Sequence, residues 1–395
     1  MRVYENAPLT LPEIQADDFL GWFDGDGNQY FNNSFINSDL TLYATYKKAI
    51  VTITFIVDGE AHKAEIPSGS ALSTADGFSL ADVWQDKNGF AWDAASIVEH
   101  DLVLYAADTD NIVRTLDEFK AALMGTNNSI IVGAEIPVTE TLVVNRSVSI
   151  SAIDGGSLIR PEGFTDVLLK IETKNNAPTE VTIGNLLIDG KNIEAQAPAV
   201  SLDSTSTLTL RGATIRNNFN MADNWNDMYG GAVYSAGRLY IYEGTTLCSN
   251  KAYNGGAIEI DCDDETACLY LYGGDICHNS AWNTSGCEGG GGGVHIGNNE
   301  VTDYVAFYMY GGRIHHNKAE SGSQYGTSSG GGVSLTCGDD GIHFVMYDGS
   351  ITDNYTDGNG GAVYTGCSSM AMYDGVMARN VAEEYGGAVS HSLLR

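Results

Sequence analysis

The chain has 395 residues, of which 51 are acidic and 20 are basic, so its formal charge is −31. A surface this negative repels nucleic-acid phosphates and anionic lipid headgroups, which excludes both as partners, although it would accept Ca²⁺, an ion that prefers clustered oxygen ligands. No apolar run reaches the roughly 18–20 residues of a membrane span, and the first residues, MRVYENAPLT, lack the apolar core of a signal peptide.

The first hundred residues contain a tandem repeat. Within each copy the endings DLTLYA and DLVLYA alternate apolar and polar residues, as half-buried strands do. The matched pairs are all 62 residues apart: Trp22, Gly27, Asp39, Leu40, Leu42, Tyr43 and Ala44 recur as Trp84, Gly89, Asp101, Leu102, Leu104, Tyr105 and Ala106.

These copies resemble the Listeria–Bacteroides repeat, also called the internalin B-repeat, a small β-grasp-like module. The first copy carries Gly21-Trp22-Phe23, a DGDG turn and SDLTLYATY, whereas the second has the opening strand VTITFIVDGE but Val83-Trp84 in place of Gly-Trp. The resemblance implies a truncated module over 1–48 and a second module over 49–108, which act as spacers on a secreted bacterial surface protein. Because the first copy lacks its opening strand, we expect the natural protein to begin upstream of Met1.

The DGDG turn raises the question of a cofactor. Asp24, Asp26 and Asn28 have the alternate spacing of a calcium loop, but no glutamate stands at the loop's twelfth position, so a plain turn is favoured. We expect no cofactor, with Ca²⁺ as the ion that the acidic surface would accept.

A short helix is predicted over about 115–124. Thr115 and Glu118 have the spacing of a capping box, and Leu116, Phe119 and Leu123 form an apolar face. The helix resembles the capping helix at the start of many parallel β-helices, and residues 109–395 are predicted to form such a right-handed parallel β-helix.

The repeat unit of this region is apolar–x–apolar–Tyr–x–Gly–x–apolar–x–x–Asn, followed by a loop and Gly-Gly-(Ala/Gly)-Val. Its spacing of 26 to 38 residues fits one coil of short strands rather than a helical solenoid. Stacked coils place equivalent residues in columns, so the asparagines should bond the backbone of buried turns and the glycines should supply positive φ at corners. The asparagines are 218, 250, 279, 317, 354 and 380, the Gly-Gly pairs begin at 230, 255, 291, 330, 360 and 386, and Leu271, Met309, Met346 and Met372 are expected to point inward.

The chain ends at GGAVSHSLLR, partway through a coil. Because an open end exposes strand edges, we expect the protein to continue beyond Arg395 or to be covered there by a partner.

The seven cysteines test the coil register. Equivalent positions in adjacent coils predict disulfides Cys248–Cys277 and Cys337–Cys367, and Cys262–Cys268 could close one loop, which leaves Cys287; columns of reduced thiols are the alternative. The spacing does not match a zinc site, so no metal centre is predicted.

A ligand site is predicted where the coils are irregular. Long insertions follow Asn218, Asn279 and Asn317, and they lie on one edge of the stack. The strands after each Gly-Gly start beside that edge, and their outward residues are expected to be Tyr234, Glu259, His295, Ser334 and Tyr364, with Asp261 one pleat further. The predicted ligand-binding residues are Trp225, Tyr234, Glu259, Asp261, Trp282, His295 and Tyr325. A second aromatic column, Tyr240, Tyr270 and Tyr308, is interpreted as structural stacking.

Catalytic residues are not identified by any motif. Glu259 and Asp261 are the weak candidates, because two carboxylates on one strand face could approach the separation that a glycosidase needs. β-Helix polygalacturonases combine Asn-Thr-Asp, Asp-Asp, His-Gly and Arg-Ile-Lys elements, of which only Asp263-Asp264 is present, and the basic residue of a pectate lyase is missing beside these acids.

The sequence therefore resembles the repeat-rich surface proteins of gut Gram-positive bacteria. We expect an extracellular, monomeric adhesin that binds host or microbial glycans or surface proteins through the β-helix. A glycoside hydrolase or polysaccharide lyase on the same scaffold is the alternative.

Overall fold

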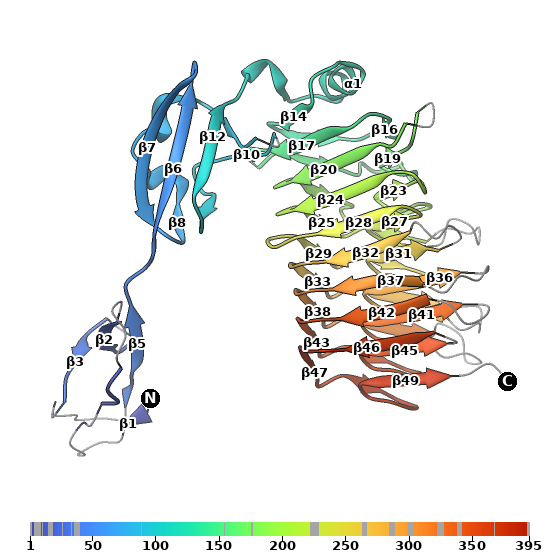
Figure 1. The fold of residues 1–395 in the computed structure, drawn as a ribbon. Helices are drawn as coiled ribbons and strands as arrows, with labels where there is room; N and C mark the ends of the chain where they lie inside the picture. Colours follow the sequence, from blue (N-terminus) through green and yellow to red (C-terminus); the bar gives the residue numbers. More distant parts are fainter. Residues whose placement is uncertain are drawn as a thin grey trace. The chain divides into compact units, whose positions relative to one another are not determined.

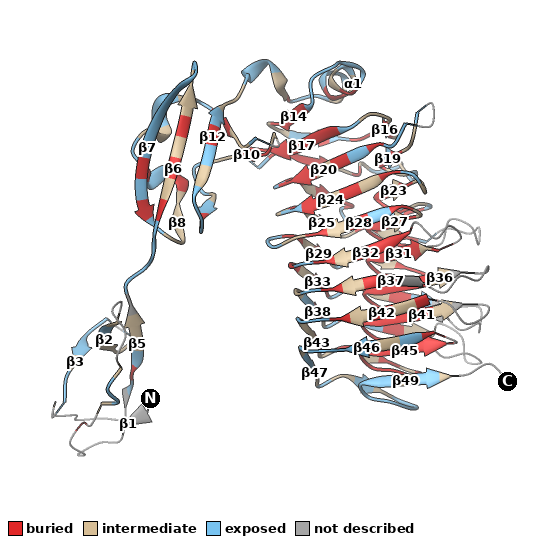
Figure 2. Ribbon diagram, viewed as in Figure 1, coloured by how far each residue is buried: buried red, intermediate tan, exposed pale blue. Residues whose placement is uncertain are grey.

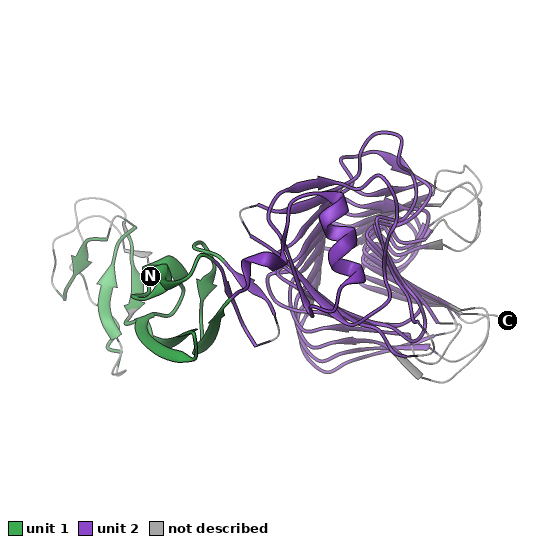
Figure 3. Cartoon of the chain, turned by 90° about the horizontal axis from the view of Figure 1, so that it is seen from above, with its two compact units in different colours: residues 1–82, 93–106 green, residues 83–92, 107–395 purple. Residues whose placement is uncertain are grey.

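A computed structural model gives the structure of the chain. It describes residues 2–392 except 4–8, 10, 15–18, 26, 33, 35–39, 88, 154, 175–176, 222–228, 263–266, 284–288, 299–303, 322–327, 338–341 and 367. The chain divides into two compact units, the first with residues 1–82 and 93–106 and the second with residues 83–92 and 107–395 (Figure 3). Within the described residues, no helix is both long and apolar enough to cross a membrane.

The first unit is built on a β-hairpin. Strand β6 (Ile50–Val57) turns at Asp58-Gly59 into the antiparallel β7 (Glu60–Pro67), and β12 (Leu102–Ala106) lies parallel to β6. Strand β6 contains most of the expected opening strand VTITFIVDGE, and its alternate residues are buried, with Ile53 and Phe55 fully inside. The other strands of this unit are β1 (Arg2–Val3), β2 (Phe19–Phe23), β3 (Gln29–Tyr30), β4 (Leu40–Thr41), β5 (Tyr43–Tyr46), β8 (Ser70–Ala71) and β11 (Ile97–Val98).

The DGDG turn of the first unit is closed by its own residues. Asn28 donates from its backbone and side-chain nitrogens to the two carboxylate oxygens of Asp24, at 2.8 and 2.9 Å, and the Tyr30 hydroxyl donates to the same carboxylate at 3.0 Å. Asp26 lies outside the described residues. The Asp24 carboxylate therefore serves to close the turn, as the plain-turn interpretation expects.

The second unit is a stack of long parallel sheets, the arrangement that a β-helix solenoid produces, and we call it the strand stack (Figure 1). Each coil contributes strands to up to four sheets, which are numbered here in the order that the chain visits them. Sheet 1 contains β13 (Ile112–Val113), β14 (Ser129–Val132), β17 (Val148–Ala152), β20 (Glu180–Gly184), β24 (Thr207–Arg211), β28 (Arg238–Ile241), β32 (Cys268–Leu271), β37 (Tyr304–Met309), β42 (Ile342–Met346) and β46 (Ser369–Met372). Sheet 2 contains β15 (Glu135–Pro137), β18 (Ser157–Ile159), β21 (Leu187–Asp189), β25 (Thr214–Arg216), β29 (Thr246–Cys248), β33 (Asp275–Cys277), β38 (Arg313–His315), β43 (Ser350–Thr352) and β47 (Val376–Ala378).

The other two sheets flank the predicted loop edge. Sheet 3 contains β22 (Glu194–Ala195), β26 (Phe219–Asn220), β30 (Lys251–Ala252), β34 (Ser280–Asn283), β39 (Lys318–Ser321), β44 (Tyr355–Thr356) and β48 (Val381–Ala382). Sheet 4 contains β16 (Leu142–Val144), β19 (Leu169–Ile171), β23 (Val200–Leu202), β27 (Val233–Ser235), β31 (Ile258–Asp261), β36 (Val294–Asn298), β41 (Val333–Cys337), β45 (Val363–Gly366) and β49 (Val389–Ser392). Two further short strands, β35 (Gly289–Gly290) and β40 (Ser328–Ser329), pair between sheets 3 and 4 along the chain.

The start of the stack is covered as predicted. Helix α1 (Leu116–Met124) is the one α-helix of the described residues, and Thr115 and Glu118 form the expected capping box. Phe119 and Leu123 are buried against the first coils. The hairpin of β9 (Trp84–Gln85) and β10 (Ala91–Trp92) also belongs to this unit.

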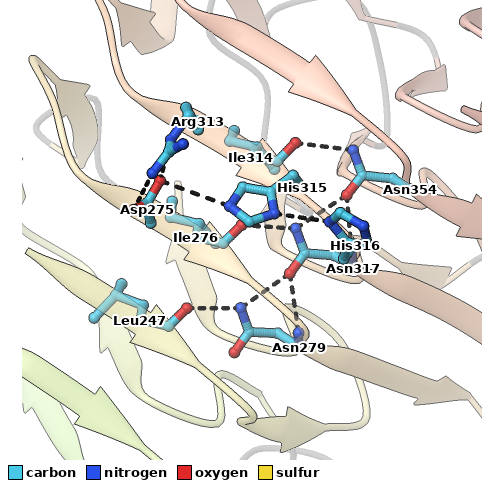
Figure 4. Close-up of polar contacts among 10 residues, drawn as sticks. All are labelled: Leu247, Asp275, Ile276, Asn279, Arg313, Ile314, His315, His316, Asn317 and Asn354. Carbon is cyan, nitrogen blue, oxygen red and sulfur yellow. Dashed lines mark hydrogen bonds and ion pairs between the residues drawn. The ribbon is translucent and has the colours of Figure 1, made fainter. Parts of the chain in front are cut away.

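The asparagine column forms the predicted hydrogen-bonded ladder. From Asn250 onward, the side-chain oxygen of each asparagine accepts from the backbone and side-chain nitrogens of the asparagine one coil earlier, as Asn317 does from Asn279 at 3.0 Å for both (Figure 4). Each side-chain nitrogen also donates to a backbone carbonyl, for example from Asn317 to Ile276 at 2.8 Å. The ladder runs through Asn218, Asn250, Asn279, Asn317, Asn354 and Asn380.

The Gly-Gly pairs serve two different purposes. The first glycine of each pair has a φ between 58° and 71°, which confirms the predicted corner. A Cβ on the second glycine would lie 2.2 to 2.5 Å from a backbone oxygen in every pair except the last, where the nearest atom to a Cβ on Gly387 is 3.3 Å away. A Cβ on Gly292, for example, would lie 2.4 Å from the Gly331 carbonyl oxygen of the next coil. The second glycine is therefore required by the close approach of adjacent coils.

The inward column of sheet 1 is confirmed with one exception. Leu271, Met309 and Met346 are fully buried, whereas Met372 is 44% exposed. Met372 lies on β46, the last strand of its sheet, so no further described coil covers it; the exposed colouring of β49 in Figure 2 has the same origin. The prediction that Met372 is buried is wrong for this reason.

Candidate functional site

The outward column of sheet 4 contains the predicted residues, but most of them are buried. Register places Tyr234, Glu259, His295, Ser334 and Tyr364 on successive strands, as predicted. Tyr234 is half-buried, and the other four are at most 4% exposed. The expectation of an open row of side chains on this face is therefore wrong.

Glu259 and His295 form a buried hydrogen-bonded pair. His295 Nδ1 lies 2.8 and 2.9 Å from the two carboxylate oxygens of Glu259, and its Nε2 lies 2.8 Å from the hydroxyl of Thr336. Burial raises the pKa of Glu259, while His295 opposes the shift. The three side chains make an acid–imidazole–hydroxyl series across three adjacent strands.

A glycine gives this series its space. The side chains lean from their own column toward the next outward column, which contains Asp261, Gly297 and Thr336. A Cβ on Gly297 would lie 2.8 Å from Cε1 of His295 and 3.4 Å from a Glu259 carboxylate oxygen. The missing side chain leaves room for the imidazole and carboxylate over Gly297, which contributes to the burial of Glu259 and His295.

Asp261 does not join Glu259. Its carboxylate accepts a hydrogen bond from the Tyr234 hydroxyl, on the strand before it. The two candidate catalytic carboxylates are therefore engaged with different partners, Glu259 with His295 and Asp261 with Tyr234. This arrangement gives no evidence that they work as a pair on one glycosidic bond.

The predicted aromatic residues are only partly described. Trp225 and Tyr325 lie outside the described residues, whereas Trp282 is on β34 and is 38% exposed. The Lys251 ammonium lies over the Trp282 ring, 4.3 Å from its centroid, which is within the range of a cation–π contact. Trp282 therefore presents a polarised aromatic ring next to the insertion that follows Asn279.

Other charged and aromatic residues share this face of sheet 3. Lys318 lies over the Tyr355 ring at 5.3 Å and forms an ion pair with Glu320 at 2.5 Å. The Tyr355 hydroxyl donates to Glu383 at 2.6 Å, and this bond raises the pKa of Tyr355 to about 12. We call this face the edge strip; its residues are Lys251, Trp282, Lys318, Glu320, Tyr355 and Glu383.

Two ladders of tyrosines follow the outer side of sheet 1. Tyr240, Tyr270 and Tyr308 stack with ring centroids 4.6 and 5.3 Å apart, as the sequence indicated. A second ladder, which sequence reasoning missed, is formed by Tyr242, Tyr272, Tyr310, Tyr347 and Tyr373, with neighbouring centroids 4.9 to 5.2 Å apart. Because ring faces in a ladder cover one another, these residues contribute stacking more than open faces for a ligand.

The described cysteines are thiols. Cys248 and Cys277 are register partners on β29 and β33, as predicted, but neither they nor Cys262 and Cys268 are joined in a disulfide. Register partners in parallel strands hold their Cβ atoms roughly at the inter-strand spacing of 4.8 Å, wider than the usual disulfide range of about 3.5–4.5 Å. In the structure these four cysteines are therefore reduced, which was the alternative to the predicted disulfides. Cys287, Cys367 and the side chain of Cys337 lie outside the described residues.

Comparison of the chain with protein-family models, with curated proteins and with solved structures finds no match.

Proposed function

We propose that the chain is part of a secreted bacterial surface protein that binds glycans or surface proteins through the strand stack. In this proposal the stack is a right-handed parallel β-helix, and residues 1–108 are B-repeat modules that act as spacers. The stacked parallel sheets and the 62-residue repeat support these assignments. The negative charge of −31 favours an extracellular, monomeric protein with uncharged or cationic ligands.

The observation that carries the binding proposal is the exposed Trp282 ring in the edge strip. Aromatic rings stack on the apolar faces of sugars, and the neighbouring lysine and glutamate side chains offer donors and acceptors to hydroxyl groups. Lys251 and Lys318 hold Trp282 and Tyr355 in defined positions through their ring contacts. A preordered strip of this kind loses little side-chain entropy on binding.

The test is a glycan array probed with the whole chain, followed by product analysis for each glycan that binds. We expect binding without product, and at least a tenfold loss of affinity in Trp282→Ala. Tyr373→Ala is the matched control, because Tyr373 is an exposed aromatic residue of the ladder beside sheet 1 and should leave binding unchanged. Absence of binding, or equal binding by Trp282→Ala, would overturn the proposal.

A glycan-active enzyme is the second candidate, and the Glu259–His295–Thr336 series is the observation that favours it. An acid that orients an imidazole next to a hydroxyl is the arrangement that activates a nucleophile. Ser334, on the strand next to His295, adds a buried hydroxyl with no hydrogen-bond partner among the described residues. Product release that disappears in both Glu259→Gln and Thr336→Val would establish this alternative.

A further inference from the structure

Two histidines and a cysteine from adjacent coils meet at the corner that follows sheet 2. One ligand atom each from Cys277, His278 and His315 lies within 4.8 Å of the other two. Cys277 is the last residue of β33, His315 is the last residue of β38, and the two are register partners. The group is therefore assembled by stacking and not by spacing along the chain.

His278 and His316 occupy equivalent positions at this corner, each directly before an asparagine of the ladder. The two histidines have positive φ angles of 56° and 54°, and their rings stack with centroids 5.0 Å apart. Histidine is tolerated in this left-handed region, so a turn role explains these two residues alone. It does not explain why His315 directs Nδ1 to within 2.9 Å of the His316 Nδ1.

His315 has a carboxylate on one side and a second imidazole on the other. Its Nε2 lies 3.6 Å from the Asp275 carboxylate, an ion-pair distance that is too long for a hydrogen bond, and its Nδ1 lies 2.9 Å from the His316 Nδ1 (Figure 4). A carboxylate near a metal-binding imidazole fixes its tautomer and ring orientation once the two come within hydrogen-bonding distance. Arg313, the nearby cation, is held by two bonds to Asp275 at 2.6 and 2.7 Å, so its charge is balanced where a metal ion would approach.

The donor set and its exposure decide the kind of ion. One sulfur and two imidazole nitrogens suit Zn²⁺ and exclude Ca²⁺ and Mg²⁺, which require oxygen ligands. Cys277 is buried, His315 is half-buried and His278 is exposed, so the group is closed on the protein side and open to solvent. A four-coordinate ion needs ligand atoms roughly 3.3–3.8 Å apart, so binding requires side chains of the group to rotate, and the exposed His278 has the most room of the three to do so.

We propose that Cys277, His278 and His315 bind one Zn²⁺ ion, with the fourth position left to solvent. The ion joins two adjacent coils through side chains and so fastens the stack at the corner between β33 and β34. This assignment replaces the sequence-based expectation that the chain has no metal site.

The test uses the whole chain, first treated with a chelator and then titrated with Zn²⁺ against a chromophoric competitor, and with Co²⁺ for its spectrum. We expect one equivalent of tight binding and a thiolate-to-cobalt charge-transfer band. Cys277→Ser should abolish the band, and His278→Ala and His315→Ala should each weaken Zn²⁺ binding at least about 100-fold. Asp275→Asn should weaken it about 10-fold, the effect of removing a supporting carboxylate.

Two controls separate the site from general histidine and cysteine binding. His343→Ala removes a histidine of sheet 1, away from the proposed site, that is hydrogen-bonded to Ser369 on the next strand. Cys268→Ser removes a buried thiol of the same sheet. Both variants should bind Zn²⁺ like the unaltered chain. His278 is exposed, so its replacement should not disturb folding, which circular dichroism would check. No tight equivalent of Zn²⁺, or affinity that is unchanged in His278→Ala and Cys277→Ser, would overturn the proposal.

Discussion

Glu259 and His295 lie on adjacent strands, 36 positions apart in sequence, and the imidazole Nδ1 bridges both carboxylate oxygens at 2.8 and 2.9 Å. Both side chains are 5% exposed, although they occupy an outward column of the sheet. Because the protein excludes most water from them, the Glu259 carboxylate depends on His295 for its hydrogen bonds, and His295 depends on Glu259 and Thr336.

The pair predicts unequal effects of two substitutions. Glu259→Ala leaves His295 buried without its acid and should cost about 3–5 kcal/mol of unfolding free energy. Glu259→Gln retains an amide that can accept from His295 and should cost about 1–2 kcal/mol. Urea denaturation followed by circular dichroism measures both, and equal midpoints for Glu259→Ala and the unaltered chain would contradict a buried pair.

The asparagine ladder predicts a position effect. Asn317 is 1% exposed and bonds to asparagines on both sides, so Asn317→Ala orphans buried groups in two coils and should cost about 3 kcal/mol. Asn380 is half-buried at the end of the ladder, and Asn380→Ala should cost about 1 kcal/mol. Chemical denaturation compares the two variants, and a larger loss for Asn380→Ala would refute the ladder as the source of stability.

The second glycines predict a steric effect. Gly292→Ala places a methyl group 2.4 Å from the Gly331 oxygen, so the adjacent coils must separate, and we expect a loss of more than about 3 kcal/mol. Gly163→Ala meets no atom within 4 Å, and its φ of 85° should cost only about 1–2 kcal/mol. Thermal unfolding of both variants checks the order; similar melting temperatures would show that the coils are not closely packed at Gly292.

The Asp353–Arg379 pair predicts a pH dependence. Two bonds of 2.6 Å from the guanidinium lower the pKa of Asp353 from its ordinary 3.8 to about 2. Because the folded pKa lies below the unfolded value, the stability from this carboxylate is complete above about 3.8 and is lost as the pH falls toward 2. Carboxyl NMR titration should show the pKa returning toward 3.8 in Arg379→Ala, whereas an unchanged pKa would assign the shift to another cause.

The skeleton of the strand stack could be predicted because each coil repeats the same local requirement. Asn317 and Gly292 stand at fixed offsets in the pattern, and stacking turns a fixed offset into a column. Met372 was misplaced because burial at the end of a stack depends on whether another coil follows, which the pattern within one coil does not contain.

The candidate sites depend on contacts between coils and were harder to predict from the sequence. The Glu259 and His295 side chains are buried partly because they extend over Gly297, and the sequence of a single strand does not reveal this contact. The Cys277–His315 contact was missed because metal ligands were sought at short spacing along the chain. The signal was present: both residues stand two positions before a ladder asparagine, so one register relates them.

The ladder bonds of each asparagine reach only the coils next to it, so no coil depends on its absolute place in the series. A gene that duplicates or deletes one whole coil would therefore keep every remaining bond intact, and the protein would lengthen or shorten in steps of about 4.8 Å. Each coil's insertion could then diverge separately, because nothing in the asparagine column constrains its length. Such a chain can change its reach and its surface chemistry independently, which suits a protein that meets varied partners.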